Sequence, residues 1–240
     1  MEKIGNEPDE YEDSFSYNIE RRKFAIADGV SETCFSKLWS NILTESFVNS
    51  DYSLFSHGPL TSNSVNTLLL SFLQYSQKEW SKKINWKNLP WYVERKAKRG
   101  AFATFLGFEV KEVKEGSWRW RAIAVGDCCL FQIGETISDI FPRYKSSDFG
   151  NEPFSLPSIS SPEILKKCKV EFKEGKVKKE KIVLSTDALA KWIIEQYEIG
   201  KDDWKKILLM QERDMKSFFK KIIEKGEMRN DDLTLLLLDF

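Results

Sequence analysis

The sequence predicts a mixed α+β fold built on antiparallel sheets. Short apolar runs of strand length lie toward both ends of the 240-residue chain, and amphipathic helical patterns lie between them and near the C-terminus. Between residues 101 and 140 the runs follow one another with short turns, which is typical of antiparallel pairing. We find no internal repeat and no clear linker. One domain over residues 1–240 is therefore predicted, with its first and last strands in the same sheets.

The N-terminal part is predicted to hold two strands followed by three helices. Glu20 and Arg21 form the turn between the strands, and Ser31 or Thr33 caps the first helix. The second helix has apolar residues at helical spacing, and Pro90 opens the short third helix. The predicted strands cover residues 13–19 and 22–28, and the predicted helices cover residues 35–48, 64–83 and 90–98.

After Gly100 the hydrophobic period changes to that of strands, and an antiparallel meander is predicted. Prolines and serines make residues 141–162 an irregular loop. A further hairpin is expected to turn at Glu174-Gly175-Lys176. The predicted strands cover residues 101–113, 118–126, 128–133, 136–140, 168–172, 179–185 and 233–239, and the predicted helices cover residues 187–197 and 202–225.

Charge and cysteine content narrow the classes of function. Basic and acidic residues number 37 each, so the formal net charge is zero, which argues against a nucleic-acid binder that uses bulk positive charge. Basic stretches at 94–99 and 166–181 are interpreted as solvated faces. No run approaches the ~20 apolar residues of a membrane helix, and the acidic residues 1–12 do not resemble a secretory signal. The four cysteines form no C-x-x-C pair, which favours a reduced, cytoplasmic protein.

Two sets of side chains are assigned to the core, although each has a functional alternative. Cys128 and Cys129 are expected to be buried thiols on opposite faces of a strand, with a cysteine nucleophile as the alternative. Five tryptophans at strand or helix spacing are expected in the core, with a partner surface as the alternative. These are Trp80, Trp86, Trp91, Trp118 and Trp120.

Four apolar runs each end or begin in an aspartate. Asp28, Asp127 and Asp187 follow such runs, and Asp231 precedes the last one. A carboxylate where a buried strand stops is costly unless it is paired or bound to a cation. Hard cations such as Mg²⁺ and Mn²⁺ prefer carboxylate and water ligands. Each aspartate alone has a turn or helix cap as its ordinary role, but the four together predict a metal site where strand ends converge.

The order of motifs along the chain resembles the metal-dependent protein phosphatases of type 2C, in a divergent, bacterial-type branch. The resemblance spans nearly the whole chain. It implies a four-layer α/β/β/α sandwich, in which helices flank two packed antiparallel sheets, and hydrolysis of phosphoserine or phosphothreonine in a protein substrate. The motifs are Glu12-Asp13, Asp28-Gly29, Gly100-Ala-Phe-Ala-Thr-Phe, Val125-Gly126-Asp127, Ser185-Thr186-Asp187-Ala188-Leu189 and Asp231-Asp232-Leu233-Thr234.

The resemblance also implies a site with two Mn²⁺ or Mg²⁺ ions and a water that bridges them and attacks phosphorus. Asp28 would bridge both ions, the Gly29 carbonyl would bind one, and Asp187 and Asp231 would hold the other. Asp28, Asp187 and Asp231 are thus the implied catalytic set. Glu12 would bind an ion directly or through water. Asp127 would support the water shell or a weakly held third ion, and Asp13 lies next to the cluster.

The chain departs from the family pattern at several positions. No arginine stands just before Glu12 to bind phosphate, so Arg21 or Arg22 is a candidate, although turn roles are expected for both. Lys191 replaces the acid expected after Asp187, which disfavours a third ion. These departures motivate an alternative, a catalytically weak or inactive pseudophosphatase that binds a phosphoprotein. A sensor or adaptor domain without metal is a third possibility. No nucleic-acid or membrane partner is predicted.

Overall fold

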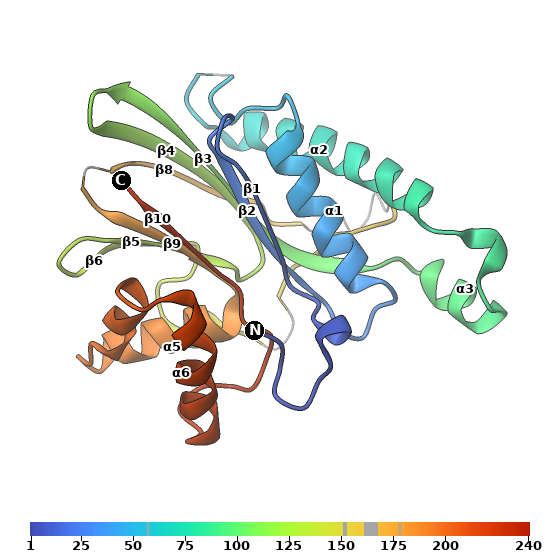
Figure 1. Ribbon diagram of the computed structural model, residues 1–240. Coiled ribbons are helices and arrows are strands. Elements are labelled where there is room, and N and C mark those ends of the chain that lie inside the picture. Colours follow the sequence, from blue (N-terminus) through green and yellow to red (C-terminus); the bar gives the residue numbers. More distant parts are fainter. Residues whose placement is uncertain (57, 151–152, 161–167, 178) are drawn as a thin grey trace.

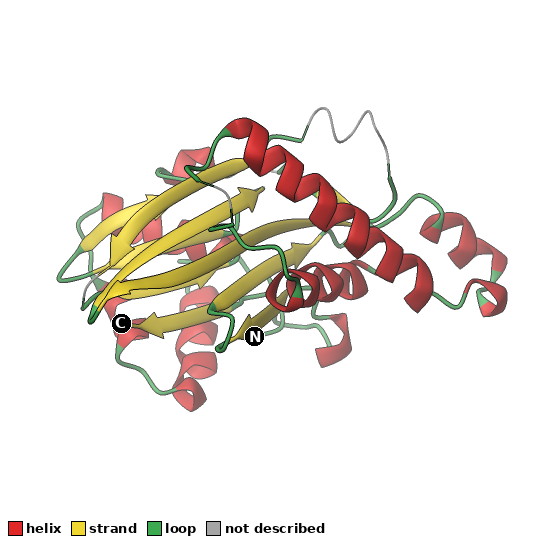
Figure 2. Ribbon diagram, turned by 90° about the horizontal axis from the view of Figure 1, so that it is seen from above, coloured by secondary structure: helices red, strands yellow, loops and turns green. Residues whose placement is uncertain are grey.

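The computed structural model describes residues 1–56, 58–150, 153–160, 168–177 and 179–240. Two antiparallel sheets pack face to face, with helices on both outer sides (Figures 1 and 2). The predicted α+β class and the four-layer α/β/β/α arrangement are therefore confirmed. Among the described residues, no helix is both long enough and apolar enough to span a bilayer.

The six-stranded sheet contains the first strands of the chain. Its order is β1-β2-β3-β4-β8, and a short strand β7 pairs with β3. All of its pairs are antiparallel. The strands are β1 (Ser14–Asn18), β2 (Lys23–Gly29), β3 (Phe102–Lys114), β4 (Ser117–Val125), β7 (Leu156–Pro157) and β8 (Glu171–Val177).

The four-stranded sheet contains the last strand and has the order β10-β9-β5-β6, again with antiparallel pairs only. Its strands are β5 (Cys129–Ile133), β6 (Ile137–Phe141), β9 (Lys181–Ser185) and β10 (Leu235–Asp239). The helices are α1 (Ser36–Asn49), α2 (Ser62–Lys83), α3 (Trp91–Ala97), α5 (Asp187–Glu198) and α6 (Glu212–Glu224). Short 3₁₀ turns cover Pro8–Glu10, Trp86–Asn88, Ser146–Asp148 and Asp203–Leu208.

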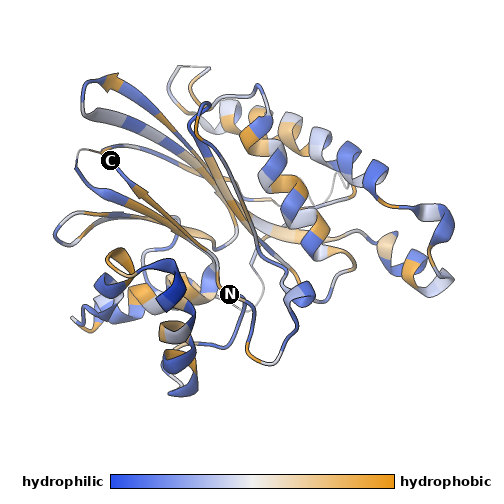
Figure 3. Ribbon diagram, viewed as in Figure 1, coloured by the Kyte–Doolittle hydropathy of each residue, from blue (hydrophilic) through white to orange (hydrophobic). Residues whose placement is uncertain are grey.

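Three apolar layers hold these four layers of structure together. In β2, Phe24 and Ile26 face the other sheet, while the small Ala25 and Ala27 face α1 and α2. This alternation is what a strand buried on both faces requires, because successive side chains point to opposite sides. The third layer packs α5 and α6 on the four-stranded sheet. Figure 3 shows the strands largely in the hydrophobic colour along the middle of the molecule, whereas the helices alternate between hydrophobic and hydrophilic residues.

Two expected connections are wrong because the chain crosses between the sheets. β4 does not pair with β5, so the predicted meander breaks after Val125, and β8 does not form a hairpin with β9. Likewise β1 and β10 lie in different sheets rather than the same ones. The hydrophobic periodicity of a strand indicates which of its faces are buried, but it does not indicate which other strand it pairs with.

The turn predicted at Glu174-Gly175-Lys176 is also wrong, because all three residues lie inside β8. Gly175 pairs with Trp120. A Cβ on Gly175 would lie 2.5 Å from the Trp120 indole, so glycine is required here for close packing rather than for a turn.

The helix predicted over residues 202–225 is divided. A 3₁₀ turn, Asp203–Leu208, buries Trp204 and Ile207, and α6 then buries Phe219 and Ile222. Between the two pieces, Gln211 is extended, with φ −75° and ψ 145°. Each piece therefore directs its own pair of apolar side chains into the core. Parts of the predicted loop 141–162 and of the basic stretch 166–181 lie outside the described residues.

Substitution of Gly175 by alanine should destabilise the fold. The added methyl group meets a fully buried Trp120, so we expect a loss of about 1–3 kcal/mol in the free energy of unfolding, measured by urea denaturation. Gly134→Ala is the matched control, because its nearest neighbour lies 3.8 Å from the added atom. Equal stability of the two variants would contradict this account of Gly175.

Candidate active site

The aspartates singled out in the sequence gather at one end of the sandwich. Asp28 is next to last in β2, and Asp127 lies between β4 and β5. Asp187 begins α5 directly after β9, and Asp231 precedes β10. The negative charges of Asp127 and Asp187 act directly on Asp28, so these three side chains belong to one electrostatic cluster. Asp231 is linked to Asp187 by the guanidinium of Arg229, which pairs with both carboxylates.

Asp13 lies at the centre of this cluster and links the two sheets. It is 3% exposed, and its Oδ2 accepts hydrogen bonds from the hydroxyls of Thr186 (2.9 Å) and Thr234 (2.8 Å). The backbone N–H of Thr234 donates to the Thr186 hydroxyl at 3.1 Å. Tyr11 adds a hydrogen bond between its hydroxyl and that of Thr234. Asp13 was expected beside the cluster, but the role of the two threonines was not predicted. In the sequence, only their closeness to Asp187 and Asp231 points to such a role.

Asp13, Asp28 and Asp127 have raised pKa values and favour protonation in the folded chain. Burial is the main cause, and it raises the pKa of Asp13 and of Asp127 to about 7 each. Asp28 is affected more strongly, since burial and the charges of Asp13, Asp187 and Asp127 all raise its pKa. Neighbouring carboxylates cannot all be ionised at low cost unless positive charge is added.

Glu12 and Gly29 meet at the start of α1. The Ser36 hydroxyl donates to the Glu12 carboxylate, and the Ser40 hydroxyl donates to the Glu12 carbonyl at 2.6 Å. A Cβ on Gly29 would lie 2.9 Å from the Glu12 carbonyl oxygen and 3.0 Å from Ser36. Gly29 is thus needed for the close approach of three backbone segments. The proposed role of its carbonyl as a metal ligand stays a prediction.

Arg229 was not identified from the sequence, yet its guanidinium pairs with both Asp187 and Asp231. The distance to Asp187 is 3.2 Å, and the contact with Asp231 is also an ion pair. These are the two acids that the resemblance assigns to a single metal ion, so a side-chain cation lies between them. The only signal in the sequence is the position of Arg229 two residues before Asp231.

Asp232 has a different role from its neighbour. It is 8% exposed, and its two oxygens accept hydrogen bonds from the backbone N–H groups of Lys3 (2.8 Å) and Glu12 (2.7 Å). It therefore fixes the N-terminal segment against the start of β10 and brings Glu12 to the cluster.

The donor atoms fit a hard divalent cation in their chemistry, but they are not gathered into a ready ligand set. Buried Oδ1 atoms of Asp13 and Asp127 have no hydrogen-bond partner among the residues that the structure describes, which suits oxygens that receive a cation. Within the described part of the chain, however, no three His, Cys, Asp or Glu side chains are close enough to share an ion. Arg229 accounts for part of this, since it pairs with Asp187 and Asp231.

A cavity of about 460 Å³ lies beside the acids. Glu12, Asp231 and Asp232 line one part of it, and the loop between β2 and α1 lines another. Two lysines, Lys3 and Lys37, also border this cavity. The cavity thus combines negative charge on the acid side with positive charge on its rim.

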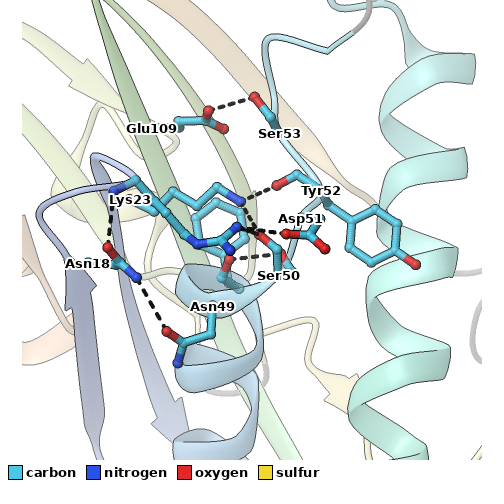
Figure 4. A network of polar contacts seen from close by, with 10 residues as sticks. Asn18, Lys23, Asn49, Ser50, Asp51, Tyr52, Ser53 and Glu109 are labelled. Carbon is cyan, nitrogen blue, oxygen red and sulfur yellow. Dashed lines mark hydrogen bonds and ion pairs between the residues drawn. The ribbon is translucent and has the colours of Figure 1, made fainter.

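The arginines proposed for phosphate binding do not reach this site. Arg21 and Arg22 lie at the other end of β2, where Arg21 pairs with Asp51 at 2.9 Å and Arg22 pairs with Glu112 at 3.7 Å. Figure 4 shows the polar network of that distant end, in which Lys23 is held by the Ser50 carbonyl. These interactions give Arg21 and Arg22 structural roles.

Two further candidates also have ordinary roles. Lys191 pairs with Glu195 one turn along α5, at 4.0 Å. Cys128 and Cys129 lie on opposite sides of the four-stranded sheet, in the central and outer apolar layers, as predicted. Burial raises the pKa of both thiols, so they stay protonated and are poor nucleophiles.

The fold is similar to that of solved bacterial serine/threonine phosphatases. The alignment with phosphatase Stp1 from Staphylococcus aureus covers 100% of this chain and 92% of the Stp1 chain, with a TM-score of 0.60 and 12% sequence identity. Phosphatase PstP/Ppp from Mycobacterium tuberculosis matches 100% and 95%, with TM-score 0.57 and 12% identity. A bacterial serine phosphatase matches 99% and 94%, with TM-score 0.57 and 14% identity.

Neither a protein-family model nor a curated relative matches the sequence. The chain therefore shares the fold of these phosphatases at low sequence identity. The predicted resemblance is confirmed at the level of fold, and the low identity agrees with a divergent branch.

The stability of the metal-free protein should fall as the pH rises toward neutrality. Burial raises the pKa of Asp127 from 3.8 to about 7, so the folded state holds this proton more tightly than the unfolded chain. The resulting stabilisation is complete below pH 3.8 and is lost as the pH rises through about 7. Unfolding midpoints in urea and a chelator should therefore decrease between pH 5 and pH 8.

Asp127→Asn removes this one titration and should make the pH dependence less steep, with the contributions of Asp13 and Asp28 remaining, whereas the exposed Asp239→Asn should leave the slope unchanged. An identical slope in wild type and Asp127→Asn would refute the assignment of the proton to Asp127.

Replacement of Arg229 should tighten divalent-cation binding. Arg229→Gln leaves Asp187 and Asp231 without their counter-charge, so we expect Mn²⁺ to bind about tenfold more tightly by calorimetry, on the order of 1.4 kcal/mol. Arg213→Gln is the control, because in the described part of the chain Arg213 forms an ion pair only with the adjacent Asp214 on α6. Unaltered Mn²⁺ affinity in Arg229→Gln would show that the guanidinium does not compete with the ion.

Proposed function

We propose that this chain is a metal-dependent phosphatase that hydrolyses phosphoserine and phosphothreonine in proteins. The observation that carries the proposal is the convergence of Asp13, Asp28, Asp127 and Asp187 at one end of the sandwich, where their pKa values or charges depend on one another. Such a cluster can be fully ionised at neutral pH at low cost only when cations are added. The shared fold with bacterial serine/threonine phosphatases supports the same reaction class.

The proposed ligands come from four separate segments. Asp28 and the Gly29 carbonyl are at the end of β2, Glu12 precedes β1, and Asp187 and Asp231 come from the four-stranded side. Two Mn²⁺ or Mg²⁺ ions bound there would polarise the phosphoryl group and supply a nucleophilic water near neutral pH. Asp127 would support the water shell of these two ions. A third ion beside Asp127 is disfavoured, because Lys191 replaces the acid expected after Asp187.

The remaining residues hold and shape the site. Asp13 holds the ends of β9 and β10 through Thr186 and Thr234, and Asp232 holds Glu12 in place. Lys3 and Lys37 line the cavity and are candidates for binding the substrate phosphate. The Lys37 ammonium donates hydrogen bonds to the carbonyls of Pro8 (3.2 Å) and Asp9 (3.1 Å), which hold it in place.

A second function, favoured by Arg229, is that of a pseudophosphatase. An ion pair of Arg229 with Asp187 and Asp231 neutralises two proposed ligands without metal. Such a protein would bind a phosphoprotein at the cavity without turnover. Binding of a phosphopeptide with no phosphate release from any substrate, whether or not Mn²⁺ is bound, would favour this second function over the first.

The four cysteines are free thiols in the structure. Because buried and unpaired thiols suit a reducing compartment, we also propose that the protein works in the cytoplasm on phosphoproteins there.

Phosphate release from a phosphothreonine peptide should require Mn²⁺ or Mg²⁺ and should depend on Asp28. Loss of a ligand shared by both ions should lower kcat/KM of Asp28→Asn at least about 100-fold. Asp239→Asn, an acid on β10 that pairs with Lys181, should retain wild-type activity. The proposal fails if Asp28→Asn releases phosphate as fast as wild type, or if a chelator has no effect.

A further inference from the structure

Residues 78–99, from the last turns of α2 through α3, form a strongly basic segment that we call the basic lobe. It contains eight lysines and arginines and only two glutamates, in a chain whose formal net charge is zero. All eight cationic side chains are exposed. The basic lobe therefore carries a local excess of positive charge, and the solvated face predicted for residues 94–99 is part of it.

Most of this charge is not neutralised. Lys82 pairs with Glu79, Lys83 pairs with Glu45 of α1, and Lys98 pairs with Glu94. The other five cations have no ion-pair partner among the residues that the structure describes. They are Lys78, Lys87, Arg95, Lys96 and Arg99.

The lobe also carries two unpacked aromatic side chains. Trp91 is 74% exposed and Tyr92 is 59% exposed, and their rings meet edge to face with centroids 6.0 Å apart. The core position expected for Trp91 is thus wrong, whereas Trp80 and Trp120 are fully buried. In Figure 1, α3 stands out beyond both sheets. Exposed tryptophan, tyrosine and arginine are the residues enriched at the energetic centres of protein interfaces.

The lobe borders the candidate active site through the loop between β2 and α1. Trp80 packs edge to face against Phe35 of this loop, with centroids 6.1 Å apart. Burial raises the pKa of Cys34 in the same loop, and the positive charge of Lys96 opposes that rise, so Lys96 is close by. Phe35 and Ser36 line the cavity that Glu12 and Asp231 also line. One loop therefore separates the cations from the acids.

We propose that the basic lobe is a docking surface for an acidic segment of the phosphoprotein substrate. This inference rests on the proposed phosphatase function and specifies its substrate class, phosphosites flanked by glutamates and aspartates. A substrate phosphate in the cavity would place residues a few positions away over the lobe, where five unpaired cations attract carboxylates and Trp91 and Tyr92 offer apolar contact. Such charge complementarity speeds encounter and orients the substrate.

The first experiment measures docking without catalysis. A fluorescein-labelled glutamate decapeptide should bind the wild-type protein in anisotropy titrations, more weakly as salt is raised, and a glycine–serine decapeptide should not. Charge reversal by Arg95→Glu, Lys96→Glu and Arg99→Glu should weaken binding at least about tenfold. Trp91→Ser, which keeps all charges, should weaken it as well. The control reverses the same charge on α6 with Arg213→Glu, Lys220→Glu and Lys221→Glu and should bind normally.

The second experiment compares phosphopeptides with acidic and with neutral flanks. The charge-reversal variant should lose its preference for the acidic flank through a higher KM, with unchanged kcat and unchanged hydrolysis of para-nitrophenyl phosphate. Hydrolysis without any acidic preference overturns the docking proposal and leaves the phosphatase proposal intact. Binding of the acidic peptide without hydrolysis of any phosphopeptide overturns the phosphatase proposal and leaves the basic lobe as a binding surface for acidic peptides. If charge reversal abolishes binding to phosphatidylserine vesicles or to single-stranded DNA but not to the acidic peptide, the lobe serves another partner and the proposal is wrong.

Discussion

The packing of the two sheets and the arrangement of the candidate site both depend on the buried carboxylate of Asp13. This residue immediately precedes β1 in the six-stranded sheet, and it accepts hydrogen bonds from Thr186 after β9 and Thr234 before β10 in the other sheet. Each threonine is close in sequence to a proposed ligand, Asp187 or Asp231. Hydrogen bonds to a charged acceptor contribute about 1.5–3 kcal/mol. The distance of those ligands from Asp28 is therefore set by how the sheets pack, and not by loops alone.

The acid cluster places an excess of negative charge at the same end of the molecule. Arg143 compensates part of it, since it donates to Glu171 at 2.7 Å and to the Gly126 carbonyl at 3.0 Å beside Asp127. Arg229 compensates another part from the solvent side. Locally unfavourable groups that a stable scaffold holds together are typical of sites that bind a ligand.

The sequence predicts the ends of the strands better than it predicts which strands pair with one another. Asp28, Asp127 and Asp187 were located because an apolar run stops at each of them, and this is a local signal. The crossings from β4 to β5 and from β8 to β9 were missed, because a buried strand has the same pattern whichever sheet it joins. Gly175 was wrongly predicted to be a turn residue, because the Trp120 ring, which leaves no room for a side chain at this position, is far away in sequence. Arg229 was missed because its partner Asp187 lies in another segment.

The hydrogen bonds that fix the N-terminal segment have a consequence for how the protein folds. Asp232 binds the backbone of Lys3 and Glu12, and Asn230 binds that of Ile4, across more than 200 residues of sequence. Closing so large a loop costs chain entropy, and topologies rich in such contacts fold slowly. During synthesis, a chain that has not yet reached residues 230–234 lacks these contacts and cannot assemble its acid cluster. Glu12 and Asp231 should therefore reach the candidate site together only after the last strand is in place.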